Sequence, residues 1–345
     1  MGRPKRMRDL MGALKDKVSL IKATLILSTS STATTSFQVA VLRATNHHPI
    51  DPPPDYILDD VLALGAHHRP TASAVVDSIL QRLHRTQSAF VALKCLLTIH
   101  HILRRGSPVL KAQLSHHHLL NLSTFRDDSD SDTVELSKWV RWYAEVIQQT
   151  LIVSDSLGFS LSSPPSHKTQ NREERITFRN SMRELNSLVG MVEQICRAPD
   201  SLHYQRISMV YEVMKLAGED YRITLREIVN RVTEFGEKLI EELSSETVEE
   251  LLNDLKRLED CKEKVFLMFL NKKKSDGTWD SIAQLRRDVE EVKQRRENLS
   301  LVAFQGGELT GLAGPPSAES KSVVPRGKRW LDVQWNHLAV NNGPR

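Results

Sequence analysis

The segment from Ser88 to Leu103 is apolar on nearly every face of a helix, and between Ala89 and Ile99 only Lys94 and Thr98 are polar. A helix that is apolar all round must be covered by other helices. At 1.5 Å per residue the segment reaches roughly 24 Å, which is short of a bilayer core. It ends at Arg104–Gly106, where basic residues in the last turn are followed by glycine. We therefore predict the central helix of a multilayered helical domain.

Shorter apolar repeats at helical spacing occur on both sides of this segment, and no alternating strand pattern competes with them. The prolines at 49 and 52–54 exclude a helix over 43–56, and the Ser/Thr-rich run 28–36 predicts a loop. Asp132, with Glu135 three residues later, predicts a capped helix start. The fold class is therefore all-α. The expected helices cover residues 7–23, 37–44, 56–64, 71–83, 88–105, 108–122, 132–153, 174–197, 202–240, 246–271 and 279–298.

Composition divides the chain into four parts. Ser154 to Lys168 is rich in serine and contains Pro164 and Pro165, which predicts a linker. After Ala303 the composition shifts to Gly, Pro and Ser and predicts disorder. Residues 328–340 carry two tryptophans and are either a short anchor or a chance feature of the tail. We expect helical domains over 1–160 and 174–300, a linker over 161–173 and a mostly disordered tail over 301–345.

Positive charge is concentrated at the amino terminus, although the formal net charge of the chain is only +4. A basic amphipathic helix over 7–23 can lie on a membrane surface, and a helix packed on the domain with a solvated charged face is the alternative. Nucleic acid is a disfavoured partner because the basic residues are mostly confined to this helix. The candidate side chains for binding anionic lipid here are Lys5, Arg6, Arg8, Lys15 and Lys17.

Catalytic chemistry is not indicated. The chain has no Walker loop, no G-x-G-x-x-G, no H-E-x-x-H and no G-x-S-x-G, so we expect neither an enzyme nor a cofactor. Three distant cysteines give no disulfide framework and no zinc spacing. Ten of the thirteen histidines lie between His47 and His118. Adjacent histidines point about 100° apart on a helix, which disfavours zinc, so phosphate contact near Arg43 or Arg104 is the preferred hypothesis.

Five segments carry a family resemblance. They are GALKDKVS (12–19), VLRATNH (41–47), VALKCLLTIHHILRRG (91–106), LLNLSTFRD (119–127) and ELSKWVRWYAEVI (135–147). Together, and in this order, they resemble the ANTH domain of the clathrin assembly proteins, in its plant branch. The resemblance implies a superhelical stack of helices over 1–160, the ENTH-like half of the domain, followed by the helical bundle of its second half. It also implies binding to phosphatidylinositol bisphosphate, clathrin and cargo at coated pits.

The lipid motif of that family is a Lys, nine residues, and then a Lys or Arg shortly before a His or Tyr. Arg43 and Tyr56 match its first and last positions, whereas Pro53, Pro54 and Asp55 replace the basic residues between them. Each lost charge-assisted contact is worth roughly 1.5–3 kcal/mol, so the loss of two predicts an affinity lower by about 100-fold or more.

Neighbouring positive charge is the expected compensation. His47 and His48 lie beside the motif, and the basic first helix adds about 1 kcal/mol per charge near anionic lipid. These contributions predict diffuse binding to anionic lipid without headgroup selectivity.

The resemblance also implies protein partners and a location. The partners are clathrin heavy chain and a vesicle SNARE helix held in a groove of the second half. The location is the cytoplasmic face of membranes, at clathrin-coated pits and vesicles, with the Golgi apparatus as a further candidate. No D-P-F, N-P-F or D-L-L-type motif follows Ala303, so clathrin binding is less secure than membrane binding.

The expected function is a non-enzymatic endocytic adaptor that promotes formation of clathrin-coated vesicles. The alternative is a soluble helical protein-interaction scaffold that has lost phosphoinositide selectivity, and Asp55 and the short tail favour it.

Overall fold

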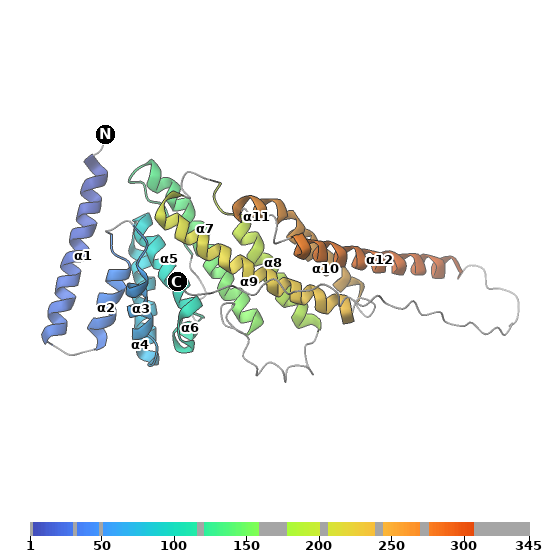
Figure 1. Ribbon diagram of the computed structural model, residues 1–345, viewed down its shortest axis with the longest axis horizontal. Helices are drawn as coiled ribbons and strands as arrows, with labels where there is room; N and C mark the ends of the chain where they lie inside the picture. Colours follow the sequence, from blue (N-terminus) through green and yellow to red (C-terminus); the bar gives the residue numbers. More distant parts are fainter. Residues whose placement is uncertain are drawn as a thin grey trace, which may run out of the picture. The chain divides into compact units, whose positions relative to one another are not determined.

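The computed structural model describes residues 3–29, 33–47, 51–115, 121–158, 178–200, 206–238, 244–269 and 276–306. No strand occurs in these ranges, and the all-α prediction is confirmed. Met1–Arg296 form one compact unit, and of the second, Glu297–Arg345, only the last turns of one helix are described. The first half (Figure 1) consists of α1 (Arg3–Thr29), α2 (Ala33–Ala44), α3 (Asp55–Leu64), α4 (Arg69–Arg85), α5 (Ala89–Arg105), α6 (Pro108–Ser115) and α7 (Ser131–Leu157).

The helix α5 is the centre of the first half, as predicted. It contacts α2, α3, α4, α6, α7 and α9 (Ser208–Lys238), and every side chain from Val91 to Leu103 is buried. Its first turn is held by Asp127, whose carboxylate accepts the Ala89 N–H at 2.9 Å. At its end a Cβ on Gly106 would lie 2.4 Å from the carbonyl oxygen of Ile102. Glycine is therefore required there for close approach of the chain rather than for a left-handed conformation.

The predicted loop over 28–36 is wrong for most of its length. The helix α1 continues to Thr29, and α2 begins at Ala33, which leaves only residues 30–32 outside the described structure. Hydroxyl side chains are unfavourable chiefly in helix interiors, whereas the first turn of a helix accommodates them well. The run TTS at the start of α2 occupies such a turn, so its composition does not prevent a helix.

Both ends of α7 differ from the prediction. The N-cap is Asp130, two residues before the predicted Asp132, and its carboxylate accepts the Thr133 N–H at 2.8 Å in a capping box. The helix also continues past the predicted start of the linker at Ser154. The reason is that Val153 and Leu157, four residues apart on one face, are both fully buried. Gly158, in the left-handed conformation at φ 70°, ends the helix.

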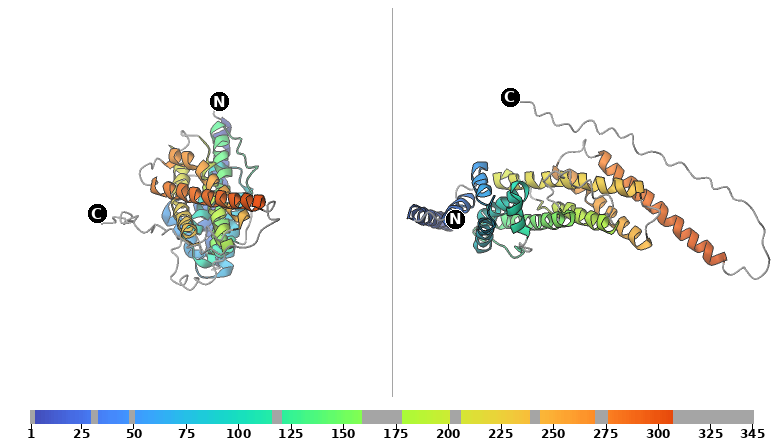
Figure 2. Two further views of the ribbon diagram at one scale, coloured as in Figure 1. Left: turned by 90° about the vertical axis from the view of Figure 1, so that its right-hand side faces the viewer. Right: turned by 90° about the horizontal axis from the view of Figure 1, so that it is seen from below.

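Long helices form the second half: α8 (Phe178–Cys196), α9, α10 (Ser245–Asp260), α11 (Lys262–Phe269) and α12 (Asp276–Gly306). The helix α8 contacts α7, α9 and α10, and Figure 2 shows α8 and α9 running side by side. The predicted single helix over 246–271 is wrong, since the chain breaks at Cys261 between α10 and α11. The helix α12 extends beyond the predicted end at 298, to Gly306.

One hydrophobic core runs through the first unit, from Phe37 of α2 to Val289 of α12. The predicted linker after Gly158 and the predicted anchor over 328–340 lie outside the described residues. The division into domains at 161–173 therefore stays a prediction. Within the described ranges, no helix has both the length and the apolar character needed to cross a membrane.

Candidate functional site

The helix α1 presents an apolar stripe to solvent. Leu10, Met11, Leu14, Val18 and Ile21 have exposed fractions between 54% and 67%. At 100° per residue these five positions fall within about 100° of the helix circumference. This stripe, defined by these five residues, is large and apolar, and α1 packs mainly on α2 through its other faces.

Lysines border the stripe on both sides. Lys15 and Lys22 lie just beyond one edge, Lys17 lies at the other, and all three are exposed. Two of the predicted lipid-binding residues, Lys15 and Lys17, are therefore placed where charge flanks an apolar face. The predicted residues Lys5, Arg6 and Arg8 belong to α1 as well, but their side chains lie outside the described structure.

The stretch that matches the family's lipid motif has a different character. Arg43, in the last turn of α2, and Tyr56, in the first turn of α3, are both exposed. Between them, Pro53 is buried and Asp55 lies 3.3 Å from the guanidinium of Arg105. A carboxylate engaged with an arginine occupies a position where the motif would present a cation.

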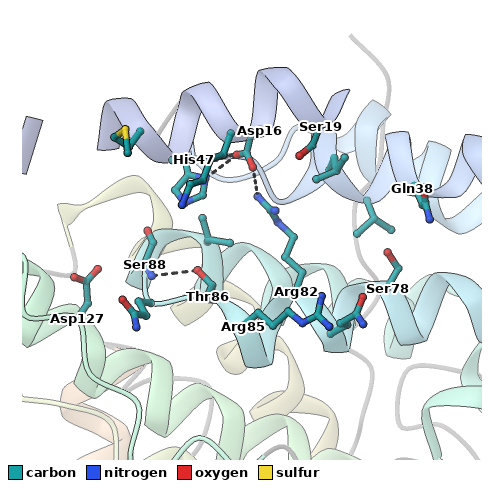
Figure 3. Close-up of a pocket in the computed structure, with 18 of the residues that line it drawn as sticks. Asp16, Ser19, Gln38, His47, Ser78, Arg82, Arg85, Thr86, Ser88 and Asp127 are labelled. Atoms are coloured by element: carbon teal, nitrogen blue, oxygen red, sulfur yellow. Dashed lines mark hydrogen bonds and ion pairs between the residues drawn. The ribbon is translucent and has the colours of Figure 1, made fainter. Parts of the chain in front are cut away.

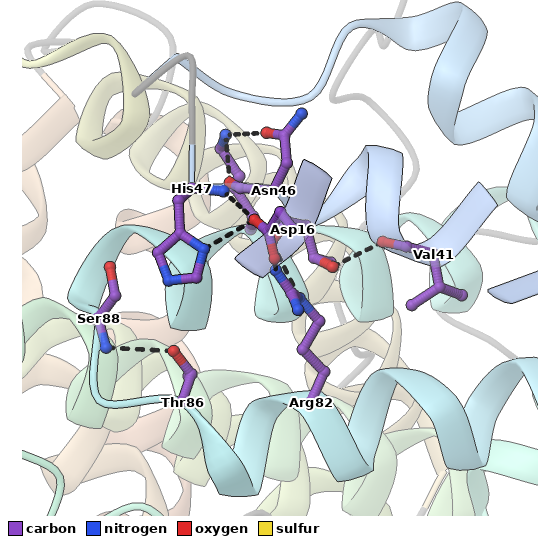
Figure 4. A network of polar contacts seen from close by, with 9 residues as sticks. Asp16, Val41, Asn46, His47, Arg82, Thr86 and Ser88 are labelled. Atoms are coloured by element: carbon purple, nitrogen blue, oxygen red, sulfur yellow. Dashed lines mark hydrogen bonds and ion pairs between the residues drawn. The ribbon is translucent and has the colours of Figure 1, made fainter. Parts of the chain in front are cut away.

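Asp16 holds the inner face of α1 to the rest of the unit (Figure 4). Its carboxylate lies 2.7 Å from Nδ1 of His47 and accepts the His47 backbone N–H at 2.8 Å. The other carboxylate oxygen accepts a hydrogen bond from Arg82 of α4 at 2.8 Å. We call Asp16, His47 and Arg82 the outer cluster. His48, the other predicted histidine, lies outside the described residues.

The segment after α2 is bound by three helices through its backbone and side chains. Arg82 donates to the carbonyl oxygen of Thr45 at 2.8 Å. The buried Lys94 of α5 donates to the carbonyl and side-chain oxygens of Asn46 at 3.0 and 2.9 Å. The ATNH sequence that carries much of the family resemblance therefore joins α1, α4 and α5 in this structure. As a lipid contact, His47 stays a prediction.

The surroundings shift two pKa values in this region. Burial alone would raise the pKa of Asp16, but the hydrogen bond from His47 and the charge of Arg82 outweigh it and hold the pKa below its ordinary value. Burial lowers the pKa of Lys94 to about 8, although the charges of Asp51 and Asp16 act in the opposite direction. Burial of Lys94 in the core therefore disfavours the charged form of its ammonium group.

Gly12 sets how closely α1 approaches the outer cluster. A Cβ at this position would lie 2.5 Å from Cδ2 of His47. Any larger residue would push α1 away from the histidine or displace the ring. Gly12 is thus required for the geometry that brings Asp16 to His47 and Arg82.

A cavity of about 890 Å³ lies beside the outer cluster, lined by residues of α1, α2, α4 and α5 and of the segments after α2 and before α5 and α7. Figure 3 shows Asp16 and Ser19 of α1 opposite Ser78 and Arg82 of α4. Lys15, Lys22 and Arg85 also line it. None of these three cations has a hydrogen bond or ion pair within the described part of the chain. This open cavity is therefore lined by three cations that have no partner among the described residues.

The histidines near Arg104 are buried, which contradicts the hypothesis of phosphate binding there. His100 is fully buried, with Nε2 2.8 Å from Asp220 and Nδ1 2.7 Å from the Tyr143 hydroxyl. Arg104 pairs with Asp220 at 2.8 Å and with Glu219 at 2.7 Å. We call His100, Arg104, Tyr143, Glu219 and Asp220 the inner cluster.

His101, next in the chain, is also buried. Burial, with the charge of Arg105 and of His100, lowers its pKa to about 3, so it stays neutral. Among the described residues, no group of His, Cys, Asp and Glu has the arrangement of a metal site.

Sequence reasoning missed Asp16, Lys22, Arg82 and Arg85 as parts of this site. The available signal was spacing: Lys15, Ser19 and Lys22 recur on one face of α1, and Ser78, Arg82 and Arg85 recur on one face of α4. That the two faces meet depends on the packing of α1 and α4 against α2, which spacing within one helix does not contain.

The fold and site define a class: an all-helical protein whose first helix, held by an ion cluster, offers an apolar stripe bordered by lysines. Comparison with known families gives a match of residues 36–266 to the model described as ANTH domain. A protein of Arabidopsis thaliana named "Putative clathrin assembly protein" is 40% identical over 299 residues, covering 83% of this chain and 82% of the relative. A second protein of that name and organism is 29% identical over 307 residues, covering 86% and 89%. The chain belongs to the ANTH domain family.

Proposed function

We propose that this chain is a clathrin assembly adaptor that lies on the cytoplasmic face of an anionic membrane through α1. Membership in the ANTH domain family and the names of its relatives support the clathrin part. The observation that carries the membrane part is the apolar stripe of α1 between Lys15 and Lys22 on one side and Lys17 on the other.

Physical chemistry favours a bilayer surface as the occupant of this stripe. A helix in the membrane interface buries its apolar face among acyl chains while lysines at the borders reach the headgroups. Burying each large side chain contributes about 1.5–3 kcal/mol, and each lysine near anionic lipid adds about 1 kcal/mol. The arrangement of α1 meets both requirements without the motif between Arg43 and Tyr56.

Co-sedimentation with vesicles tests the membrane part. We expect wild type to bind vesicles of phosphatidylcholine and phosphatidylserine and not vesicles of phosphatidylcholine alone. Leu14→Glu places a charge in the stripe and should weaken binding by about 10- to 100-fold. The matched control is Leu267→Glu, because Leu267 of α11 is also an exposed leucine, at 74%, and it lies outside the stripe.

Equal binding by Leu14→Glu and the control would show that the stripe is not the membrane contact. Arg43→Glu adds a second comparison, since the motif is expected to contribute little. If Arg43→Glu weakens vesicle binding as much as Leu14→Glu does, the motif that contains Arg43 also contributes to the membrane contact.

The proposed partners are clathrin heavy chain and a vesicle SNARE helix, and the proposed locations are coated pits, coated vesicles and the Golgi apparatus. Co-sedimentation of the full chain with assembled clathrin in the absence of lipid tests the first partner. Binding to clathrin supports adaptor function, and its absence contradicts it.

The soluble protein-interaction scaffold is the second candidate, and the ion pair between Asp55 and Arg105 favours it, because it occupies the position of the motif's cation. If wild type binds none of these vesicles, the scaffold is the better conclusion.

A further inference from the structure

Two of the three cysteines meet in the second half of the fold. Cys196 is the last residue of α8, and Cys261 lies between α10 and α11. The Cys196 thiol donates a hydrogen bond to the Cys261 thiol, and its sulfur also lies 3.7 Å from the carbonyl oxygen of Cys261. Both cysteines are free thiols in this structure. Packing therefore brings together two thiols that are 65 residues apart in the chain.

Ion pairs between α8 and α10 fix the position of this thiol pair. Arg257, shortly before Cys261 in the chain, donates to both carboxylate oxygens of Glu193 in α8, at 2.9 and 2.6 Å. The same guanidinium donates to the side-chain oxygen of Asn186 at 3.0 Å. A disulfide bond of about 2.05 Å forms without strain only between cysteines whose backbones are already close. The packing of α8 on α10 meets that requirement before any bond forms.

The pair lies closer to the surface than the third cysteine does. Cys196 and Cys261 are 6% and 7% exposed, whereas Cys95 in the central helix α5 is 0% exposed. Access and ionisation decide whether a cysteine reacts. The pair therefore retains the solvent contact that a small oxidant needs, and Cys95 does not.

The two thiols also differ in how easily they ionise. The hydrogen bond from Cys196 lowers the pKa of Cys261, although burial and the charges of Glu193 and Asp260 act in the opposite direction. The charge of Arg197 adds to the lowering. The same hydrogen bond and burial raise the pKa of Cys196. Cys261 is thus the thiol that more readily supplies a thiolate, and Cys196 is the thiol that keeps its proton.

We propose that Cys196 and Cys261 form an oxidation site, at which a peroxide converts the two thiols into a reversible disulfide between α8 and the start of α11. The Cys261 thiolate attacks one oxygen of hydrogen peroxide. The O–O bond breaks, hydroxide leaves, and Cys261 becomes a sulfenic acid. The Cys196 sulfur then attacks the Cys261 sulfur, the S–O bond breaks, and the departing hydroxide takes the Cys196 proton. Two thiols are oxidised to one disulfide, and one peroxide is reduced to two waters.

The disulfide closes a loop that contains the whole of α9 and α10. A cross-link stabilises a fold mainly by restricting the unfolded chain, and the effect grows with the length of the loop. The bond also ties the start of α11 to α8, near the stacked rings of Tyr221 and Phe269. Oxidation therefore makes the second half harder to open, and a thiol reductant reverses the change. This site requires neither a membrane nor clathrin, so it goes beyond the proposed function.

Peptide mapping of the full chain by mass spectrometry tests the site. The reduced protein is treated with hydrogen peroxide, its remaining thiols are alkylated after unfolding, and it is digested without reductant. We expect a cross-linked pair of peptides that contains Cys196 and Cys261 and disappears with dithiothreitol. Cys95 is the internal control, because burial raises its pKa to about 12, and it should be recovered alkylated. The melting temperature of wild type should rise by about 5 °C or more on oxidation.

Single variants separate the attacking thiol from its partner. Cys196→Ala should accumulate a sulfenic acid at Cys261 that dimedone traps, with no rise in melting temperature. Cys261→Ala should react at Cys196 at least about 10-fold more slowly. Circular dichroism checks that both variants fold. Equal trapping in the two variants would overturn the role of Cys261 as the attacking thiol.

Three results with wild type alone would overturn the site, so the test does not depend on the folding of either variant. They are the absence of the cross-linked pair, a disulfide that joins two separate chains, and oxidation of Cys95 as fast as that of the pair. Each of these results leaves the proposed membrane function standing, because the measurements contain no lipid.

Discussion

The outer and inner clusters use the same chemistry at different depths. Each combines an aspartate on one helix with a histidine and an arginine from other parts of the fold, which lie after α2 and on α4 in the outer cluster and both on α5 in the inner cluster. In the outer cluster the Asp16 and His47 side chains are 13% and 22% exposed, whereas in the inner cluster Asp220 and His100 are 1% and 0% exposed. The outer cluster joins α1 to α4 and the segment after α2, and the inner cluster joins α5, α7 and α9.

Burial decides what each cluster does. In the inner cluster water cannot replace a lost partner, so a single deletion leaves a buried group uncompensated. In the outer cluster water reaches the site and limits the cost. The inner cluster therefore fixes the junction of the two halves, whereas the outer cluster holds a helix that the proposed function places on a membrane.

The largest effect is expected from Asp220→Ala. It removes the partner of both His100 and Arg104 in a dry site, and should lower the free energy of unfolding by about 3–5 kcal/mol. Urea denaturation measures it. The matched control is Glu219→Ala, which removes the other partner of Arg104 at an exposed fraction of 29% and should cost less than about 1 kcal/mol. Equal costs for the two variants would contradict the distinction by depth.

A smaller, pH-dependent effect is expected at Lys94, which reaches from the core helix to Asn46 beside the outer cluster. Its folded pKa of about 8 lies below the ordinary value of 10.5. The unfolded chain therefore binds more protons between these values, and stability rises with pH across this window. Relative to Lys94→Met, wild type should gain on the order of 3 kcal/mol from pH 8 to above pH 10.5. Parallel stability curves would mean that Lys94 is not desolvated.

The smallest of the three effects is expected from Asp16→Asn, at about 1–2 kcal/mol near pH 7. The folded pKa of Asp16 is below the ordinary value of 3.8, so its contribution is present above that value and lost as pH falls through the folded pKa. The curves for wild type and variant should converge below pH 3.8. Hydrogen exchange should show faster opening of α1 in the variant. Asp59→Asn, at a 62% exposed carboxylate, is the control and should leave α1 protected.

Much of the architecture follows from sequence alone, because helical periodicity is a local property. The continuous apolar run of α5 required a covered central helix, and the structure has one. The resemblance of five segments to the ANTH domain led to the correct family. Helix ends were less predictable. The continuation of α7 to Leu157 depends on burial against other helices. The break at Cys261 could not be predicted from a Gly or Pro, because neither residue occurs there.

The candidate site was also predictable from the sequence only in part. Sequence identified Lys15 and Lys17 on an amphipathic helix, and it showed that Pro53, Pro54 and Asp55 interrupt the motif. Only the tertiary structure decided that the apolar side of α1 faces solvent, since an amphipathic pattern fits a packed helix equally well. Only packing brought Asp16 to Arg82, which is 66 residues away in the chain, and opened the cavity between α1 and α4. Sequence determines which side chains share one helix face, whereas the pairing of faces from distant helices depends on the whole core.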